Sequence, residues 1–169
     1  MRQIPAISIM GWSGSGKTTL IEKLIPILHR RQIRVGVLKH DGHDFEMDRP
    51  GKDTWRFSQA GAEVVAISSG RQAAVLENRE LELNDLLHRM RDVDLILVEG
   101  YKASDLPRIE VHRLANNKPL STDPDGLAAL VTDADIQTTT PCFALDDAQG
   151  VAALICRLAG LEQKPFLAE

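Results

Sequence analysis

The chain has 169 residues, of which 43% are hydrophobic and 26% are charged, and its formal net charge at pH 7 is −4. This length suits a single domain over residues 1–169 with a sizeable core, and the acidic balance disfavours nucleic-acid binding. No apolar run is long enough to cross a membrane, and the two cysteines match no metal or redox spacing, so we expect a cytoplasmic protein.

The first third of the chain contains its most informative pattern. Residues 4–10 are apolar and predict a strand buried on both faces, and residues 18–32 predict an amphipathic helix with a kink or break at Pro26. Between them, residues 11–19 read Gly-Trp-Ser-Gly-Ser-Gly-Lys-Thr-Thr and fit the pattern G-x-x-x-x-G-K-[ST]. This strand, loop and helix order predicts a loop that binds phosphate.

The residue types of this segment suit the chemistry of phosphate binding. A loop that wraps a phosphate points backbone N–H groups inward and adopts positive φ, which glycine does without steric cost. Lys17 is predicted to reach the β- and γ-phosphates, and the Thr18 hydroxyl to ligate Mg²⁺. Trp12 could cover the nucleotide, contact a partner or pack on the chain's own loops. The predicted nucleotide-binding residues here are Gly11, Trp12, Ser13, Gly14, Ser15, Gly16, Lys17, Thr18 and Thr19.

A polar loop follows the second predicted strand. Residues 33–39 predict that strand, which gives a right-handed βαβ unit, and residues 40–51 then leave its carboxyl end, where open α/β sheets bind their ligands. Asp41 is a candidate to reach the Mg²⁺ or to orient the attacking water, with a turn-forming role as the alternative. The same loop also admits a transition-metal site or polar residues near phosphate, formed by His40, Asp41, His43 and Asp44.

The middle of the chain ends in a second acidic candidate. The patterns predict a helix over 52–61, strands over 63–68 and 71–76, and a helix over 82–90. Residues 93–98 form the most apolar strand and end at Glu99, as a Walker-B element does. Glu99 is therefore predicted to hold the Mg²⁺ shell beside Thr18 or to position water, unless it caps the next turn.

The last third predicts three more strands and a closing helix. Residues 109–114 alternate apolar and charged side chains, which favours a half-exposed edge strand, and a loop follows over 116–126. Strands are expected over 127–132 and 141–145, and a helix over 146–158 with Asp146 or Asp147 as its N-cap. The alternation of strands and helices predicts an α/β protein of the P-loop NTPase fold, with a doubly wound, mainly parallel sheet and helices on both faces.

The base that the nucleotide would carry is poorly signalled. Many GTP-binding proteins hold guanine with Asn-Lys-x-Asp, but here Asn117 and Lys118 are followed by Pro119 and Leu120, so the acid is missing. Asp133 follows a predicted strand and is a substitute candidate for the guanine edge. A local helix or turn cap is the alternative role for Asp133.

Several ordered segments together resemble a known family. They are residues 11–19, residues 38–41 (Leu-Lys-His-Asp), residues 51–56 with 60–62, and residues 97–102 (Leu-Val-Glu-Gly-Tyr-Lys). In this order they are similar to MobB, the adaptor family of molybdopterin-guanine dinucleotide biosynthesis. The resemblance implies a homodimeric GTP-binding protein with weak GTPase activity that assists the guanylyltransferase MobA and helps to deliver nucleotide or molybdopterin. Several more distant relatives carry an extra lysine early in the loop, where this chain has Trp12.

The sequence thus supports one main hypothesis and two alternatives. In the main hypothesis, water attacks GTP, Lys17 and the loop amides stabilise phosphate charge, and Glu99 with Asp41 positions the Mg²⁺ shell and the water. No arginine finger is identified, so turnover should be slow. The alternatives are a small-molecule kinase, for which only Arg71, Arg79 and Arg108 offer loose candidates, and a nucleotide-dependent scaffold that does not hydrolyse its ligand.

Overall fold

The computed structural model describes residues 4–42, 45–101 and 104–163. The contacts within the chain define two compact units, residues 1–40 with 83–169 and residues 41–82, which are called here the sheet unit and the hairpin unit. The expectation of a single domain stays a prediction, because a division by contacts does not say whether either unit folds alone.

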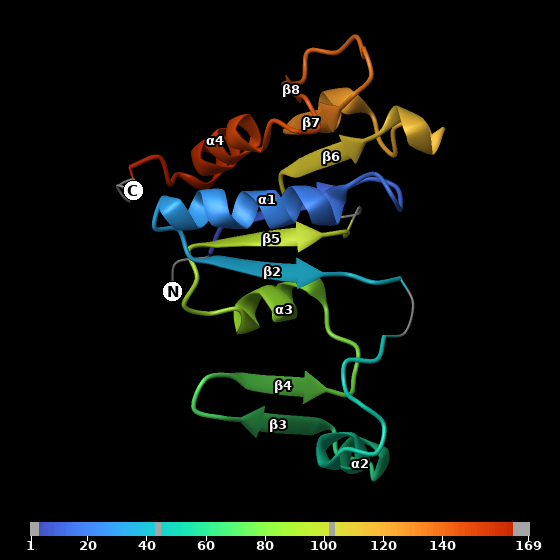
Figure 1. Ribbon diagram of the computed structural model, residues 1–169, viewed down its shortest axis with the longest axis vertical. Coiled ribbons are helices and arrows are strands. Elements are labelled where there is room, and N and C mark those ends of the chain that lie inside the picture. The colour runs from blue at the N-terminus through green and yellow to red at the C-terminus, as the bar shows by residue number, and fades with distance from the viewer. Residues whose placement is uncertain (1–3, 43–44, 102–103, 164–169) are drawn as a thin grey trace. The chain divides into compact units, whose positions relative to one another are not determined.

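The sheet unit is built on six parallel strands in the spatial order β2-β5-β1-β6-β7-β8 (Figure 1). Because every pair is parallel, each connection must return to the starting edge of the sheet, and helices or long loops make these crossings. The strands are β1 (Ala6–Met10), β2 (Val35–Lys39), β5 (Leu95–Glu99), β6 (Arg108–His112), β7 (Ala129–Thr132) and β8 (Cys142–Phe143).

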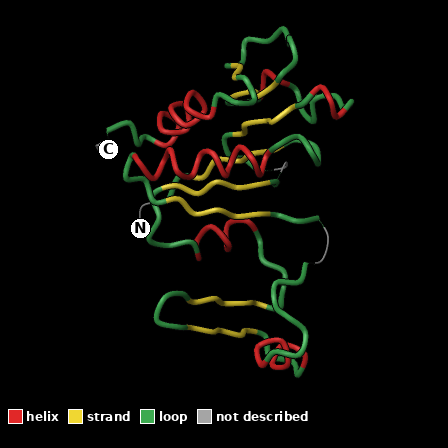
Figure 2. The backbone as a smooth tube through the Cα atoms, viewed as in Figure 1, coloured by secondary structure: helices red, strands yellow, loops and turns green. Residues whose placement is uncertain are grey.

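Helices cover both faces of this sheet, as the sequence predicts. On one face, Ile7, Ile9 and Leu97 belong to a buried cluster that includes the apolar stripes of α1 (Lys17–Arg30) and α4 (Ala148–Ala159). On the other face, buried Ala6, Ile96 and Val98 pack against side chains of α3 (Leu83–Arg89), namely Leu83 and Leu87. Figure 2 shows the strands in yellow and these helices in red.

Helices α1 and α4 test two predictions from the sequence, a kink or break at Pro26 and an N-cap at Asp146 or Asp147. Helix α1 continues through Pro26 as one helix, so the predicted break does not occur. Its buried residues lie on both sides of Pro26 and pack into the same cluster, which offsets the hydrogen bond that proline cannot donate. The expected cap of α4 is confirmed at Asp147, whose carboxylate accepts a 2.8 Å hydrogen bond from the Gly150 amide. Among the described residues, no helix combines the length and apolar composition needed to cross a bilayer.

Strand β6 contradicts the prediction of a half-exposed edge strand. It lies between β1 and β7, and Ile109 and Glu110 are both 0% exposed. Its alternating polar residues are buried because they find hydrogen-bond partners: Glu110 accepts from the Ser121 amide at 2.6 Å. The ring nitrogens of His112 lie 2.9 Å from the Thr132 hydroxyl and 3.1 Å from the Lys118 carbonyl oxygen. Alternation here reflects polar side chains that are buried with at least one hydrogen-bond partner, rather than exposure to water.

The hairpin unit contains α2 (Asp53–Gln59) and two antiparallel strands, β3 (Val64–Ser68) and β4 (Ala73–Glu77). The sequence predicts both strands, and the structure pairs them with each other in a separate two-stranded sheet rather than with the parallel strands. The turn between them is closed by a 2.8 Å hydrogen bond from the Ser69 amide to the Gln72 carbonyl, and so short a connection permits only antiparallel pairing.

Candidate phosphate-binding site

Residues 11–16, called here the glycine-rich loop, connect β1 to α1 at the carboxyl end of the sheet. Gly11, Gly14 and Gly16 have φ values of 136°, 78° and 104°, as the motif predicts. Gly11 has a second constraint, because a Cβ there would collide with the Val111 carbonyl oxygen and lie 2.9 Å from the Ser15 hydroxyl. The loop therefore needs glycine both for its backbone angles and for its contact with β6.

Positive charge gathers where the glycine-rich loop meets α1. The helix begins at Lys17 after the left-handed Gly16, and its first turn contains no acidic residue. The Lys17 ammonium donates a 3.0 Å hydrogen bond to the Trp12 carbonyl oxygen, so it lies across the loop. Unpaired backbone N–H groups at a helix start and a nearby ammonium group together favour an anion such as phosphate.

Thr18 and Glu99 meet at this edge of the sheet. The Thr18 hydroxyl lies 3.2 and 3.1 Å from the two carboxylate oxygens of Glu99, although the residues are 81 positions apart in the sequence. A hydroxyl and a carboxylate are the hard oxygen ligands that suit Mg²⁺, which usually takes one or two protein ligands and completes its shell with phosphate and water. The donor set therefore fits the predicted ion.

The remaining predicted metal ligand lies in the other unit. Asp41 is the first residue of the hairpin unit, whereas Thr18 and Glu99 belong to the sheet unit. Its predicted role at the Mg²⁺ or the attacking water therefore stays a prediction. The described residues contain no group of three or more His, Cys, Asp or Glu side chains that could hold a metal ion. The alternative transition-metal interpretation includes His43 and Asp44, which lie outside the described residues.

The ends of β2 and β5 are joined directly beside Glu99. The His40 amide donates a 2.9 Å hydrogen bond to the Glu99 carbonyl oxygen, and the His40 ring lies 4.3 Å from the Tyr101 ring. Gly100 has a φ of 101°, and a Cβ there would approach the His40 Cβ to 3.2 Å. The close approach of these two strand ends fixes the backbone that carries the Glu99 carboxylate.

A segment over residues 113–121, called here the covering loop, packs on the glycine-rich loop. The Trp12 indole donates a 2.7 Å hydrogen bond to the Pro119 carbonyl oxygen, and the Lys118 ammonium lies 5.8 Å from the centre of the Trp12 ring. The Asn116 side chain donates a 3.2 Å hydrogen bond to the Ser13 carbonyl oxygen. Of the roles that the sequence leaves open for Trp12, the structure shows packing on the chain's own loop.

Asp133 makes a local contact at the end of β7. Its carboxylate accepts a 2.7 Å hydrogen bond from the Leu114 amide, at the start of the short 3-10 helix Leu114–Asn116. This is the turn-capping role that the sequence offers as the alternative. Recognition of guanine by Asp133 stays a prediction.

One residue near the glycine-rich loop escapes the sequence analysis. The Arg113 guanidinium lies 3.5 Å from the position that a Cβ of Gly16 would occupy. Arg113 directly follows β6, and a strand at the edge of the sheet would have left it far from this loop. Only the order of the strands in the sheet would have predicted this position of Arg113, and the local sequence pattern does not encode that order.

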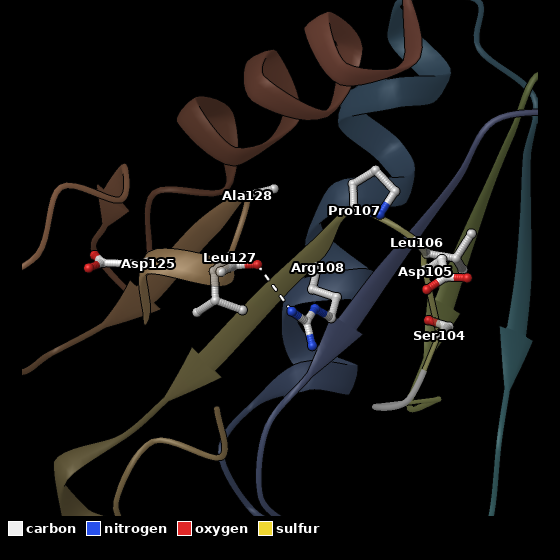
Figure 3. A pocket seen from close by; sticks show the side chains of 9 residues that line it. Ser104, Asp105, Leu106, Pro107, Arg108, Asp125, Leu127 and Ala128 are labelled. Carbon is white, nitrogen blue, oxygen red and sulfur yellow. Dashed lines mark hydrogen bonds between the residues drawn. The ribbon is translucent and has the colours of Figure 1, made fainter. Parts of the chain in front are cut away.

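The structure also has a cavity of about 600 Å³ at the amino ends of the strands, opposite the end that carries the glycine-rich loop (Figure 3). Its walls lie at the amino ends of β6 and β7, away from the glycine-rich loop. There the Arg108 guanidinium donates a 3.2 Å hydrogen bond to the Gly126 carbonyl oxygen, which Figure 3 marks with a dashed line. Arg108 is one of the arginines considered for a kinase lid. It begins β6 at the amino end of the strand, whereas the glycine-rich loop lies at the carboxyl end of the sheet, so Arg108 does not lie beside a phosphate bound there. The cavity is lined by Ser104, Asp105, Leu106, Pro107, Arg108, Asp125, Gly126, Leu127 and Ala128.

The parallel sheet, the glycine-rich loop between β1 and α1, and the Thr18–Glu99 contact define an α/β protein with the P-loop NTPase fold. Comparison with known proteins gives the family. A family model described as MobB, molybdopterin guanine dinucleotide synthesis protein B, matches residues 6–133, and the chain belongs to this family.

Individual relatives and a solved structure agree with this assignment. The molybdopterin-guanine dinucleotide biosynthesis adapter protein of Haemophilus influenzae is 40% identical over 139 residues, covering 80% of this chain and 78% of the relative. The Escherichia coli protein of the same name is 36% identical over 160 residues, covering 90% and 91%. The crystal structure of Bacillus subtilis MobB aligns with a TM-score of 0.75 at 26% identity, covering 92% of this chain and 98% of that one.

Proposed function

We propose that this protein is an adapter in the biosynthesis of molybdopterin guanine dinucleotide, and that it binds GTP with Mg²⁺ at the glycine-rich loop and hydrolyses it slowly. The family and the names of the two relatives support the adapter role. The observation that carries the nucleotide proposal is the Thr18–Glu99 contact beside Lys17 and the glycine-rich loop. This arrangement brings an anion-binding backbone, a cation and a pair of Mg²⁺ ligands to one edge of the sheet.

The proposed reaction assigns a separate task to each of these groups. The loop amides and the start of α1 stabilise the charge on the phosphates, and Lys17 adds a full positive charge at the β- and γ-phosphates. Thr18 and Glu99 would hold the ion, and Glu99 with Asp41 would orient the water. That water attacks the γ-phosphorus, the bond to the β-phosphate oxygen breaks, and GDP and inorganic phosphate form. Bound Mg²⁺ would neutralise further charge on the phosphates.

The choice of base is tested by calorimetry with GTP, GDP and ATP in the presence of Mg²⁺. We expect GTP and GDP to bind more tightly than ATP. ATP affinity equal to or greater than GTP affinity would contradict the guanine proposal and leave only a general phosphate site.

The site itself is tested with Lys17→Ala. Loss of the ammonium at the phosphates should abolish measurable GTP binding, whereas Lys23→Ala, an exposed lysine on the same helix, should bind as the unaltered protein does. Lys17→Ala affinity within a factor of a few of the unaltered protein would rule out the glycine-rich loop as the nucleotide site.

Product analysis separates the GTPase from its two alternatives. We expect release of inorganic phosphate from GTP without any added acceptor, at a low rate. Transfer that requires an acceptor hydroxyl would favour a small-molecule kinase. Binding without either reaction would favour a scaffold.

The partner proposed for the adapter is the guanylyltransferase MobA, with molybdopterin as a further ligand of the complex. An adapter requires an enzyme to act with, and the relatives' names place them in the same biosynthesis. Co-purification with that transferase, measured with and without GTP, tests this proposal. Failure to recover the transferase under both conditions would contradict it.

We also propose a homodimer, and the hairpin unit supports it. Its exposed large apolar side chains are Phe45, Met47, Phe57, Val64, Ile67 and Val75. Among the described residues of that unit, the one buried hydrophobic side chain is Val65, which is 8% exposed. So small a unit with so little buried apolar surface needs another surface to cover it. A second copy of the chain is the occupant that we propose.

A further inference from the structure

We infer that Arg113 is a second cation of the phosphate-binding site, and that it contacts the α- and β-phosphates of the bound nucleotide beside Gly16. This inference rests on the proposed nucleotide binding and adds a residue to that site. It also predicts which phosphates the residue contacts, and therefore which ligands should feel its loss.

The position of Arg113 is fixed by strand order and by close packing. Arg113 follows the last residue of β6, which pairs with β1 directly below the glycine-rich loop. The Arg113 guanidinium and the Val111 side chain lie 3.5 and 4.0 Å from the position that a Cβ of Gly16 would take. Both distances are those of ordinary van der Waals contact, so the guanidinium lies against this part of the loop.

The electrostatic surroundings of Arg113 favour an anion. Within the described residues Arg113 makes no ion pair, and its buried Nε atom has no hydrogen-bond partner. It lies near the positive end of α1, whose first turn contains Lys17 and no acidic residue. Two carboxylates belong to this part of the sheet unit: Asp133 accepts a 2.7 Å hydrogen bond from the amide of Leu114, the residue after Arg113, and Glu99 contacts the Thr18 hydroxyl.

Two cations and a helix start repel one another unless a negative group lies between them. A guanidinium with an unsatisfied buried N–H also gains most from an oxygen ligand that accepts several hydrogen bonds, and phosphate is such a ligand. The phosphates that the glycine-rich loop is proposed to bind would supply both the hydrogen-bond acceptor and the negative charge that Arg113 lacks.

The location along the loop decides which phosphates Arg113 contacts. In a loop of this pattern the backbone amides hold the α- and β-phosphates, while the lysine reaches the β- and γ-phosphates. Arg113 lies beside Gly16, in the part of the loop whose backbone amides are proposed to hold these phosphates. It should therefore stabilise bound GDP and GTP equally, and it should not act as an arginine finger on the γ-phosphate.

The experiment compares Arg113→Ala and Arg113→Lys with the unaltered protein by calorimetry with GDP and GTP in Mg²⁺, and by single-turnover hydrolysis of bound GTP. Arg30→Ala, an exposed arginine at the far end of α1, is the matched control. We expect Arg113→Ala to weaken both affinities by the same factor, about tenfold to a hundredfold. Arg113→Lys should recover part of the loss, and the single-turnover rate should stay within about threefold.

The outcomes separate this inference from the proposed function. Unchanged affinities in Arg113→Ala, or a loss confined to GTP or to the hydrolysis rate, would overturn the role at the α- and β-phosphates. Failure of the unaltered protein to bind either nucleotide would overturn the proposed function as well. Circular dichroism verifies that the variants fold. If Arg113→Ala does not fold, the lysine variant decides, because it should bind both nucleotides more weakly by one common factor.

Discussion

At the scale of single residues, the contact between Thr18 and Glu99 links the first turn of α1 to the end of β5. The hydroxyl and the carboxylate come within 3.2 Å although they are far apart in sequence. A neutral amide would keep the size of Glu99 and its ability to accept a hydrogen bond, but it would lose the charge that attracts a divalent cation. The pair thus offers a direct test of the proposed Mg²⁺ site.

Glu99→Gln should weaken GTP binding in Mg²⁺ by about tenfold, because one charged ligand of the ion is lost. In the presence of a chelator, Glu99→Gln should bind GTP about as well as the unaltered protein does, since the loop amides and Lys17 remain in both. Calorimetry under both conditions measures the difference, with Glu22→Gln on the exposed side of α1 as control. An equal loss with and without Mg²⁺ would contradict a role for Glu99 at the ion.

The two cysteines provide a second test at this scale. Cys142 is exposed, whereas Cys156 is 1% exposed and burial raises the pKa of its thiol, with nearby Arg31 lowering that pKa in part. A raised thiol pKa means less reactive thiolate at neutral pH. We therefore expect a thiol reagent at pH 7 to label Cys142 quickly and Cys156 only after unfolding. Cys142→Ser should remove the fast phase, and its persistence would show that Cys156 is accessible.

At the scale of elements, the glycine-rich loop depends on its contact with β6. A Cβ at Gly11 would meet the Val111 carbonyl oxygen, and the φ of 136° at Gly11 disfavours any other residue. Two elements that are distant in sequence thus meet at a position that only glycine fits. The loop conformation is fixed by this contact as much as by its own residues.

Gly11→Ala should lower the free energy of unfolding by about 1–3 kcal/mol and weaken GTP binding, because the loop must move away from β6. Gly70→Ala is the control, since a Cβ there has nothing within 4 Å. Urea unfolding with calorimetry measures both effects. A Gly11→Ala protein that matched the Gly70→Ala protein in stability and affinity would contradict the proposed constraint.

At the scale of the whole molecule, the proposed homodimer rests on the exposed apolar surface of the hairpin unit. Val64, Ala66 and Val75 lie on one face of the β3–β4 pair and all are exposed, whereas the opposite face carries the buried Val65 and the exposed Ile67. Apolar side chains gathered on one face of a short hairpin favour association, since covering them removes apolar surface from water.

Val75→Lys should weaken the proposed dimer by at least about tenfold, because a charge would have to be buried in the interface. Sedimentation velocity at several concentrations measures the shift from dimer to monomer. Leu158→Lys replaces an exposed apolar residue of α4, 43% exposed, and should leave the dimer intact. A monomer at every concentration of the unaltered protein would rule out the dimer, and an unchanged dimer in Val75→Lys would place the interface elsewhere.

The sequence by itself determined the features that depend on neighbouring residues. The order of strand, glycine-rich loop and helix follows from local periodicity and from the backbone freedom of glycine. The same holds for Glu99 at the end of an apolar strand and for the cap at Asp147. These patterns, together with the four resembling segments, identified the fold class and the family.

Only the tertiary structure decided the position of β6, the separate pairing of β3 with β4, the packing of Trp12 and the placement of Arg113 beside Gly16. Each of these depends on contacts between residues that are distant in the sequence. From the sequence alone, a polar residue such as Glu110 is predicted to be exposed. Only the fold places the Ser121 amide where it can donate a hydrogen bond to Glu110 and allow its burial. Strand order is set by such non-local burial and pairing, which local sequence patterns do not encode.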